Sequence, residues 1–137
     1  MVQSVDGKRN RKSVFLNETF SKINYSLNVS ILYRIPANYR KFVYCTAIRN
    51  GDDKEWEFAS AQFDKELDSG QRNNLQTGMA CTKQPWLINR YLVDQLNGSK
   101  VRLQDAAAGF SAIALNKFAN SRAWTFFKDN WDEIFSK

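Results

Sequence analysis

Four carboxylates lie within residues 52–57 of the 137-residue chain, at Asp52, Asp53, Glu55 and Glu57. Paired carboxylates can serve as general acid and general base. No nucleophile or cofactor motif accompanies this group, and the dipole of a helix already favours acidic side chains in its first turn. We therefore interpret the acidic group as the start of a helix and treat acid–base catalysis as the weaker alternative.

Histidine is absent from the whole sequence, and cysteine occurs only at Cys45 and Cys81. Without histidine, Ser-His-Asp and Cys-His catalysis and every histidine-based zinc site are excluded. Two cysteines are also too few for a cysteine-only structural zinc site. The sequence therefore predicts a chain that has no catalytic residue, no metal ligand and no cofactor of its own.

The net charge of +6 raises the question of nucleic-acid binding. Residues 1–41 contain eight Lys or Arg and two Asp or Glu, whereas residues 42–137 contain twelve of each kind. The excess charge thus belongs to the N-terminal part, and no nucleic-acid-binding motif accompanies it. We interpret it as a solvated basic tail rather than an anion-binding arm, and we expect no nucleic-acid partner.

The sequence contains neither a predicted membrane-spanning segment nor a predicted signal peptide. No apolar run approaches the length that spans a bilayer. The polar, charged start lacks the apolar core of a secretory signal peptide, so none is predicted in the chain as given.

The carboxylates of residues 52–57 and the two cysteines are predicted to lie on helices or at their ends. Pro36 separates an irregular basic leader, residues 1–35, from a helical domain, residues 36–137. About six amphipathic helices follow one another across short turns. They are predicted over residues 39–50, from 52–53 to about 67, over about 71–82, from Pro85 to about 96, from a Ser99 N-cap, and from about 121 to 135.

Consecutive helices joined by tight turns stack as antiparallel pairs. The predicted fold class is therefore all-α, an α-solenoid fragment of HEAT-like helix pairs. Large side chains on the apolar stripes are predicted to form the core rather than an aromatic ligand-binding surface. They are Trp56, Phe63, Trp86, Tyr91, Phe110, Trp124, Phe127 and Trp131.

Six segments within residues 36–137 together resemble the C-terminal helical domain of the aminopeptidase N family of zinc aminopeptidases. They follow the family order, and the resemblance does not visibly extend into residues 1–35. The segments are PANYR (36–40), VYCTAIRNG (43–51), EWEFASAQF (55–63), ACTKQPWLINRYL (80–92), VRLQDAAAGFSAIA (101–114) and AWTFFKDNWDEIF (123–135).

The resemblance implies a non-catalytic bowl of helices that encloses the peptide chamber of a catalytic domain. The family's zinc-binding HExxH and its GAMEN motif are absent from this chain, as are its last helices. Zinc therefore belongs to the parent enzyme, which releases N-terminal residues from peptides, and the expected partner is its catalytic domain or a peptide. The alternatives are a stand-alone peptide- or protein-binding helical module from a decayed paralogue, and a fragment without a function of its own.

The resemblance also pairs Cys45 with Cys81 as a disulfide, and two buried free thiols are the alternative. An oxidising compartment agrees with four N-x-Ser/Thr triplets, which are candidate glycosylation sites. They begin at Asn17, Asn24, Asn28 and Asn97. We therefore expect an extracellular or secretory-lumen location, in the parent as part of a membrane-anchored ectodomain.

Arg90 and Asp105 are charged residues that lie among apolar neighbours in predicted helices. A charge in such a position needs an opposite partner. We expect both to join a polar network between helices. The functional alternative is that Arg90 faces the chamber and contacts a peptide carboxylate.

Overall fold

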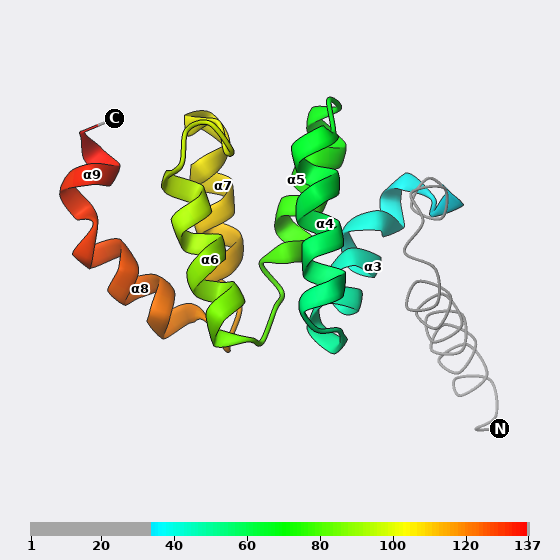
Figure 1. The fold of residues 1–137 in the computed structure, drawn as a ribbon, viewed down its shortest axis with the longest axis horizontal. Coiled ribbons are helices and arrows are strands. Elements are labelled where there is room, and N and C mark those ends of the chain that lie inside the picture. The colour runs from blue at the N-terminus through cyan, green and yellow to red at the C-terminus, as the bar shows by residue number, and fades with distance from the viewer. Residues whose placement is uncertain (1–33, 137) are drawn as a thin grey trace, which may run out of the picture.

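The computed structural model describes residues 34–136, and within this range it contains helices and turns but no strand. The helices are α3 (Ala37–Asn50), α4 (Asp53–Lys65), α5 (Ser69–Met79), α6 (Pro85–Leu96), α7 (Leu103–Ala114), α8 (Asn120–Asp129) and α9 (Trp131–Phe135). Figure 1 shows α4 paired with α5 and α6 paired with α7, with α8 and α9 at the far end of the row. The all-α fold of stacked helix pairs is therefore confirmed.

Local sequence signals explain where several helices begin. Asp52 and Glu55 form a capping box at the start of α4: the Lys54 amide donates to Asp52 Oδ1 at 3.0 Å, and the Asp52 amide donates to Glu55 Oε2 at 2.7 Å. Asp68 caps α5 by accepting from the Gln71 amide at 2.7 Å. Pro85 occupies the first turn of α6, where its missing N–H costs no intrahelical bond.

The predicted Ser99 N-cap is wrong, because α7 begins only at Leu103. The Asn97 carbonyl accepts the amides of Lys100 and Val101, which closes a turn over these residues. Val101 is buried, so the chain passes through the core before the helix can start.

The predicted sixth helix is divided in two at Asn130. Its side-chain amide donates to the Phe126 carbonyl at 2.8 Å, and its backbone φ and ψ are −111° and 20°. Asparagine side chains that bond to nearby backbone groups offer an alternative to regular helix. The chain therefore turns after α8, and α9 is a short separate helix.

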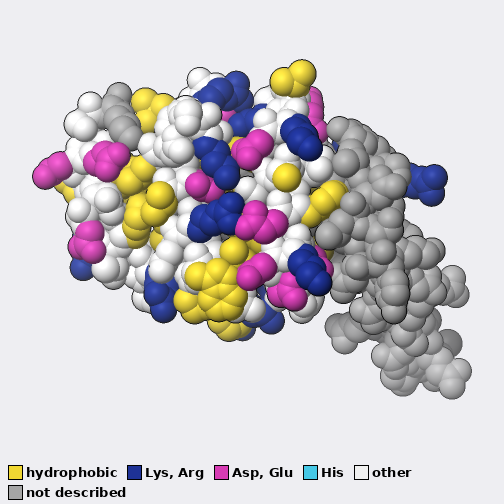
Figure 2. Space-filling model, in the orientation of Figure 1, with side chains coloured by type: hydrophobic (Ala, Val, Ile, Leu, Met, Phe, Trp, Pro, Cys, Tyr) yellow, Lys and Arg dark blue, Asp and Glu magenta, His cyan; other side chains and the backbone are white. Residues whose placement is uncertain are grey.

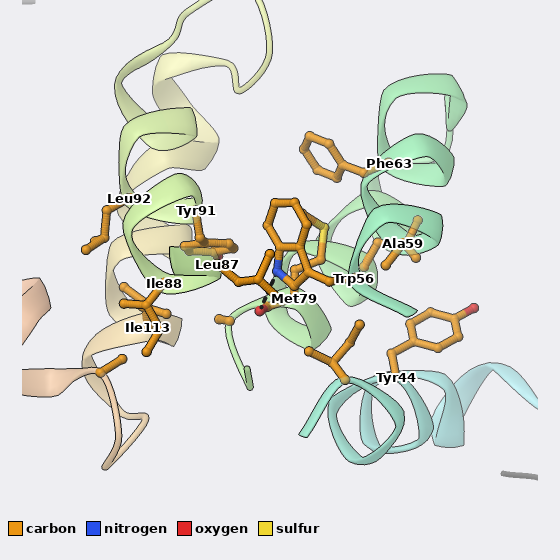
Figure 3. Close-up of a cluster of buried hydrophobic side chains, with 14 of the residues drawn as sticks. Tyr44, Trp56, Ala59, Phe63, Met79, Leu87, Ile88, Tyr91, Leu92 and Ile113 are labelled. Atoms are coloured by element: carbon orange, nitrogen blue, oxygen red, sulfur yellow. Dashed lines mark hydrogen bonds between the residues drawn. The ribbon is translucent and has the colours of Figure 1, made fainter. Parts of the chain in front are cut away.

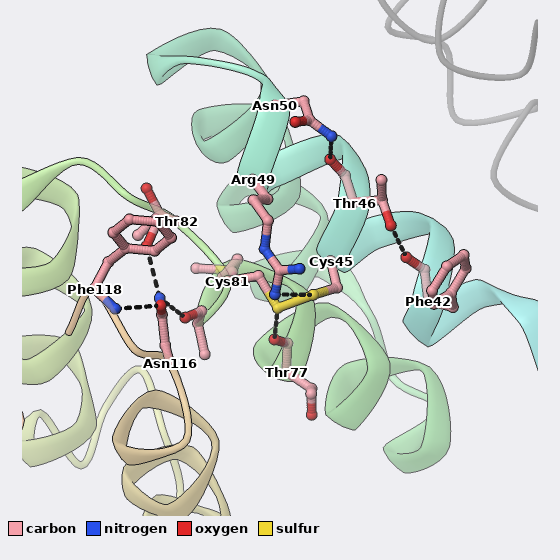
Figure 4. Close-up of a disulfide and its surroundings, with 12 residues drawn as sticks. Phe42, Cys45, Thr46, Arg49, Asn50, Thr77, Cys81, Thr82, Asn116 and Phe118 are labelled. Atoms are coloured by element: carbon pink, nitrogen blue, oxygen red, sulfur yellow. Dashed lines mark hydrogen bonds between the residues drawn. A yellow bond between two sulfur atoms is a disulfide. The ribbon is translucent and has the colours of Figure 1, made fainter. Parts of the chain in front are cut away.

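A disulfide joins Cys45 of α3 to Cys81, which lies two residues beyond α5, with their Cα atoms 5.2 Å apart (Figure 4). This is the pairing that the family resemblance implied. The same two helices approach closely at Gly78, where an added Cβ would lie 2.6 Å from the Tyr44 Cβ. Glycine is therefore required at this crossing of α3 and α5.

The core lies between the two helix pairs and centres on Trp56, which is fully buried (Figure 3). Its indole N–H donates to the Met79 carbonyl at 3.3 Å, which links α4 to α5. Phe63 and Tyr91 are also buried, as their helical spacing predicts. Ile35, the last residue of the predicted leader, is buried with this core, and the leader up to residue 33 lies outside the described residues.

Candidate functional site

The charged face of the molecule, as we call it here, lies where α4 and α6 run side by side. Figure 2 shows basic and acidic side chains alternating across the middle of this face. Arg90 of α6 forms an ion pair with Glu57 of α4, and its second nitrogen donates to Glu57 Oε2 at 3.3 Å. The Arg90 guanidinium carbon also lies 4.8 Å from the centre of the Trp56 ring. Arg90 therefore connects the two helix pairs, and both terminal nitrogens of its guanidinium group already bond to Glu57.

All four carboxylates of the acidic group have structural partners. Asp52 and Glu55 cap α4, and Glu57 pairs with Arg90. The remaining one, Asp53, accepts the Trp86 indole N–H at 2.7 Å. These contacts support the interpretation of the group as a helix N-terminus and leave no pair of carboxylates arranged for acid–base work.

Lys100 forms a second link across the charged face. Its ammonium group lies 3.1 Å from Asp94 Oδ2 of α6, and it donates to Ser60 Oγ of α4, also at 3.1 Å. Asp64 of α4 lies at 4.0 Å. Lys100 thus fastens the turn after α6 to α4. The ion pairs and hydrogen bonds of the charged face therefore connect the two helix pairs.

Asp105 lies outside the network that contains Arg90. Its carboxylate accepts from Arg102 at 2.8 Å, only three residues earlier in the chain. The expectation that both side chains join a network between helices is therefore wrong for the Asp105 carboxylate. Apolar neighbours in the sequence do not distinguish a link between helices from a local pair at a helix start.

The aromatic face, as we call it here, is formed by Trp124 and Phe127 of α8 and by Trp131 and Phe135 at the two ends of α9. Phe127 lies at its centre, with ring centroids 5.2 Å from Trp131 and 6.4 Å from Trp124. Trp131 and Phe135 are 4.1 Å apart. The ring of Phe110 on α7 lies 6.2 Å from that of Phe127. The result is a continuous aromatic surface at one end of the helical row.

Three of the tryptophans predicted for the core are exposed, so that prediction is wrong for them. The exposed fractions are 54% for Trp86, 61% for Trp124 and 49% for Trp131, and Phe110 and Phe127 are only partly buried. Helical spacing identifies the apolar side of a helix but not whether another element covers that side. No described helix covers the outer side of α8 and α9, and Trp86 lies at the rim of the charged face.

A buried polar network links α5, α6 and α7, and no motif or residue spacing predicts it. Gln76 donates to Gln95 Oε1 at 2.7 Å, and the Tyr91 hydroxyl bonds to the carbonyls of Gln76 and Gly109 at 3.1 and 3.3 Å. Burial raises the pKa of the Tyr91 phenol well above its usual value, because the charged form would be desolvated. The neutral hydroxyl therefore persists as a hydrogen-bonding group that holds three helices together.

A pocket bordered by Phe63, Tyr91 and Lys100 has room for about one water molecule. Residues 34–136 contain no cluster of three or more side chains that could hold a metal ion. The donor set agrees, because the sequence has no histidine and both cysteines form the disulfide, so these residues do not fit a zinc site.

Among the candidate glycosylation sites, Asn97 lies in the exposed turn between α6 and α7. The other three, Asn17, Asn24 and Asn28, lie outside the described residues.

Replacing Arg90 with Met is expected to lower the free energy of unfolding by less than about 1 kcal/mol, because exposed ion pairs contribute little. The methionine retains an apolar stem over Trp56 while it removes the charge. Urea unfolding of Arg90→Met, Glu57→Gln and the double variant isolates the pair. A loss above about 2 kcal/mol for Arg90→Met would contradict the view that this is a solvent-screened pair.

The comparisons with known proteins agree with this architecture. The chain matches the family model of the ERAP1-like C-terminal domain over residues 17–137, a range that begins ahead of the six segments within residues 36–137. It is 39% identical to aminopeptidase N of Bos taurus over 101 residues, 74% of this chain and 10% of that protein. It is 36% identical to aminopeptidase N of Homo sapiens over 102 residues, again 74% and 10%. It is also 35% identical to the thyrotropin-releasing hormone-degrading ectoenzyme of Homo sapiens over 98 residues, 72% of this chain and 9% of that protein.

The helical stack is thus an ERAP1-like C-terminal domain. Within that class, the chain belongs to the aminopeptidase N family. It spans about a tenth of the length of these relatives. No helix among residues 34–136 is both long enough and apolar enough to cross a membrane.

Proposed function

We propose that this chain works as the non-catalytic C-terminal domain of a zinc metalloaminopeptidase and helps to enclose its peptide chamber. The aromatic face carries the proposal. An uncovered cluster of large aromatic side chains is typical of a surface that another part of a protein covers. The family match supplies the rest, because the relatives are aminopeptidases about ten times longer than the matched region.

The parent enzyme would bind zinc through its own catalytic domain and release N-terminal residues from peptides. This chain would supply shape and rigidity. The disulfide and the links through Arg90 and Lys100 suit that task, because the disulfide fastens α3 to the chain just beyond α5 and the other two contacts fasten α4 to α6 and the turn after it. The disulfide also supports an extracellular or secretory-lumen location, since such bonds persist in oxidising compartments.

The aromatic face also favours a second function, a stand-alone module that binds a peptide or protein. The two functions differ in the size of the native protein. An antibody raised against residues 34–136 should detect a band far above 15.9 kDa, and the precipitated protein should release N-terminal residues from peptides until a zinc chelator is added. A native 15.9 kDa band without associated peptidase activity would contradict the domain proposal and favour the module.

The four tryptophans provide an internal test of which surface is covered. In the parent enzyme, hydroxyl-radical labelling is expected to miss Trp124 and Trp131, although both are labelled in the isolated chain. Trp56 is fully buried and should stay protected in both samples, whereas Trp86 marks the exposed charged face. Equal labelling of Trp124 and Trp131 in both samples would show that the aromatic face is not the contact.

The hypothesis that Arg90 meets a peptide carboxylate is tested in the same parent enzyme. Because Glu57 occupies the guanidinium, we expect Arg90→Met to leave kcat and KM for peptides unchanged. An increase in KM for free peptides, but not for peptides with an amidated C-terminus, would support the carboxylate contact instead.

A further inference from the structure

The turn between α6 and α7 carries the single N-x-Ser/Thr triplet of residues 34–136, Asn97-Gly98-Ser99. All three residues are exposed. The space around Gly98 is open, since an added Cβ there would meet no atom within 4 Å. An enzyme or a bulky group can therefore approach this turn without displacing a neighbouring element.

The side chains of the triplet are arranged for modification. Asn97 Oδ1 accepts the Ser99 amide at 3.1 Å and the Ser99 hydroxyl at 2.7 Å, which polarises the Asn97 carboxamide. Its own Nδ2 makes no hydrogen bond within the described residues. Asn97 thus presents a carboxamide nitrogen that the fold does not use.

The backbone, rather than that nitrogen, holds the turn in shape. The Asn97 amide donates to the Asp94 carbonyl at 3.2 Å, and the Asn97 carbonyl accepts from Lys100 and Val101 at 3.0 and 2.9 Å. Lys100 is further fixed by its ion pair with Asp94. A substituent on Nδ2 would therefore leave every one of these contacts in place.

We propose that Asn97 is an N-glycosylation site, which rests on the secretory-lumen part of the proposed function. The co-reactant is a lipid-linked pyrophosphoryl oligosaccharide. A bond forms between Asn97 Nδ2 and the sugar C1, the bond from C1 to the pyrophosphate oxygen breaks, the lipid pyrophosphate departs and the amide proton passes to a base.

A glycan on Asn97 would also keep the α6–α7 turn free of contacts with another domain. The α6–α7 turn lies at the opposite end of α6 from the α5–α6 connection and from the start of α8, whereas α9 lies toward the same end as the turn (Figure 1). A large hydrated group at the turn keeps that end in solvent in the assembled protein. Docking is then confined to other surfaces, including the aromatic face.

The test uses the full chain with an added cleavable signal sequence, expressed in mammalian cells, so that entry into the lumen does not depend on the identity of the parent. Only chains whose signal has been removed are collected. Peptide N-glycosidase converts each glycosylated asparagine to aspartate, which peptide mass spectrometry reads separately at Asn97 and at the other triplets.

We expect most Asn97 to be converted, and conversion to be lost in Ser99→Ala and in Gly98→Pro, which block the triplet in different ways. Gly98→Ala is the matched control, because the open space accepts a methyl group and the triplet is kept. Unconverted Asn97 in lumenal, signal-cleaved chain would overturn the proposal. So would equal conversion in the Ser99→Ala variant.

Discussion

Replacing both Cys45 and Cys81 with serine is expected to lower the free energy of unfolding by about 4 kcal/mol. The disulfide spans 36 positions of the chain, and cross-linking a loop of this length lowers the entropy of the unfolded state by an amount equivalent to about 4 kcal/mol. Stabilities of natural domains are about 5–15 kcal/mol, so this is a large share of the total. Urea unfolding at neutral pH measures it directly.

The helix that depends most on this bond is α3. It contacts α5 where Gly78 lets the two backbones approach, and the disulfide fastens the same crossing (Figure 4). Amide exchange in the serine variant should therefore rise first in α3, while α6 and α7 keep their protection. Wild-type chain in a reducing agent is the control and should unfold at nearly the same urea concentration as the variant. If the serine variant matched the oxidised wild type, the bond would not stabilise the fold.

Helix starts could be predicted from the sequence where a short-range signal decides them. Asp52 and Pro85 mark helix starts because capping and proline geometry involve only residues close in the chain. Ser99 satisfied the same short-range rule and misled, because the burial of Val101 is a tertiary requirement. At Asn130 a side-chain hydrogen bond competes with the helix, and helical spacing alone gives no sign of it.

The candidate surfaces were less predictable for a related reason. Trp56 and Trp124 both follow helical spacing, yet one is fully buried and the other is 61% exposed. The difference lies in their neighbours: helix pairs flank Trp56 on both sides, whereas α8 lies at the end of the described row. The Gln76–Gln95 bond likewise needs two helices placed side by side by the fold, and no sequence period encodes it.

Trp56→Ala is expected to cost about 3–5 kcal/mol, because it removes a fully buried indole and leaves a cavity between helix pairs. The variant also leaves the Met79 carbonyl without the indole N–H. Trp56→Phe should lose less, since a ring still fills most of the space. Trp86→Ala is the matched control: its indole also donates to an acceptor but is half exposed, so we expect a loss within about 1 kcal/mol.

The position of Trp56 also predicts which helices lose protection from amide exchange first. It contacts α5 through Met79 and lies beneath Arg90 of α6, so it is shared by both helix pairs. Losing it should weaken the attachment of α4–α5 to α6–α7 more than either pair internally. Amide exchange should then show α6 and α7 keeping protection at urea concentrations where α4 has lost it. Equal loss of protection in all four helices would mean that the stack unfolds as one unit. If Trp56→Ala lowered the free energy of unfolding no more than Trp86→Ala does, the contacts that stabilise the stack would lie elsewhere.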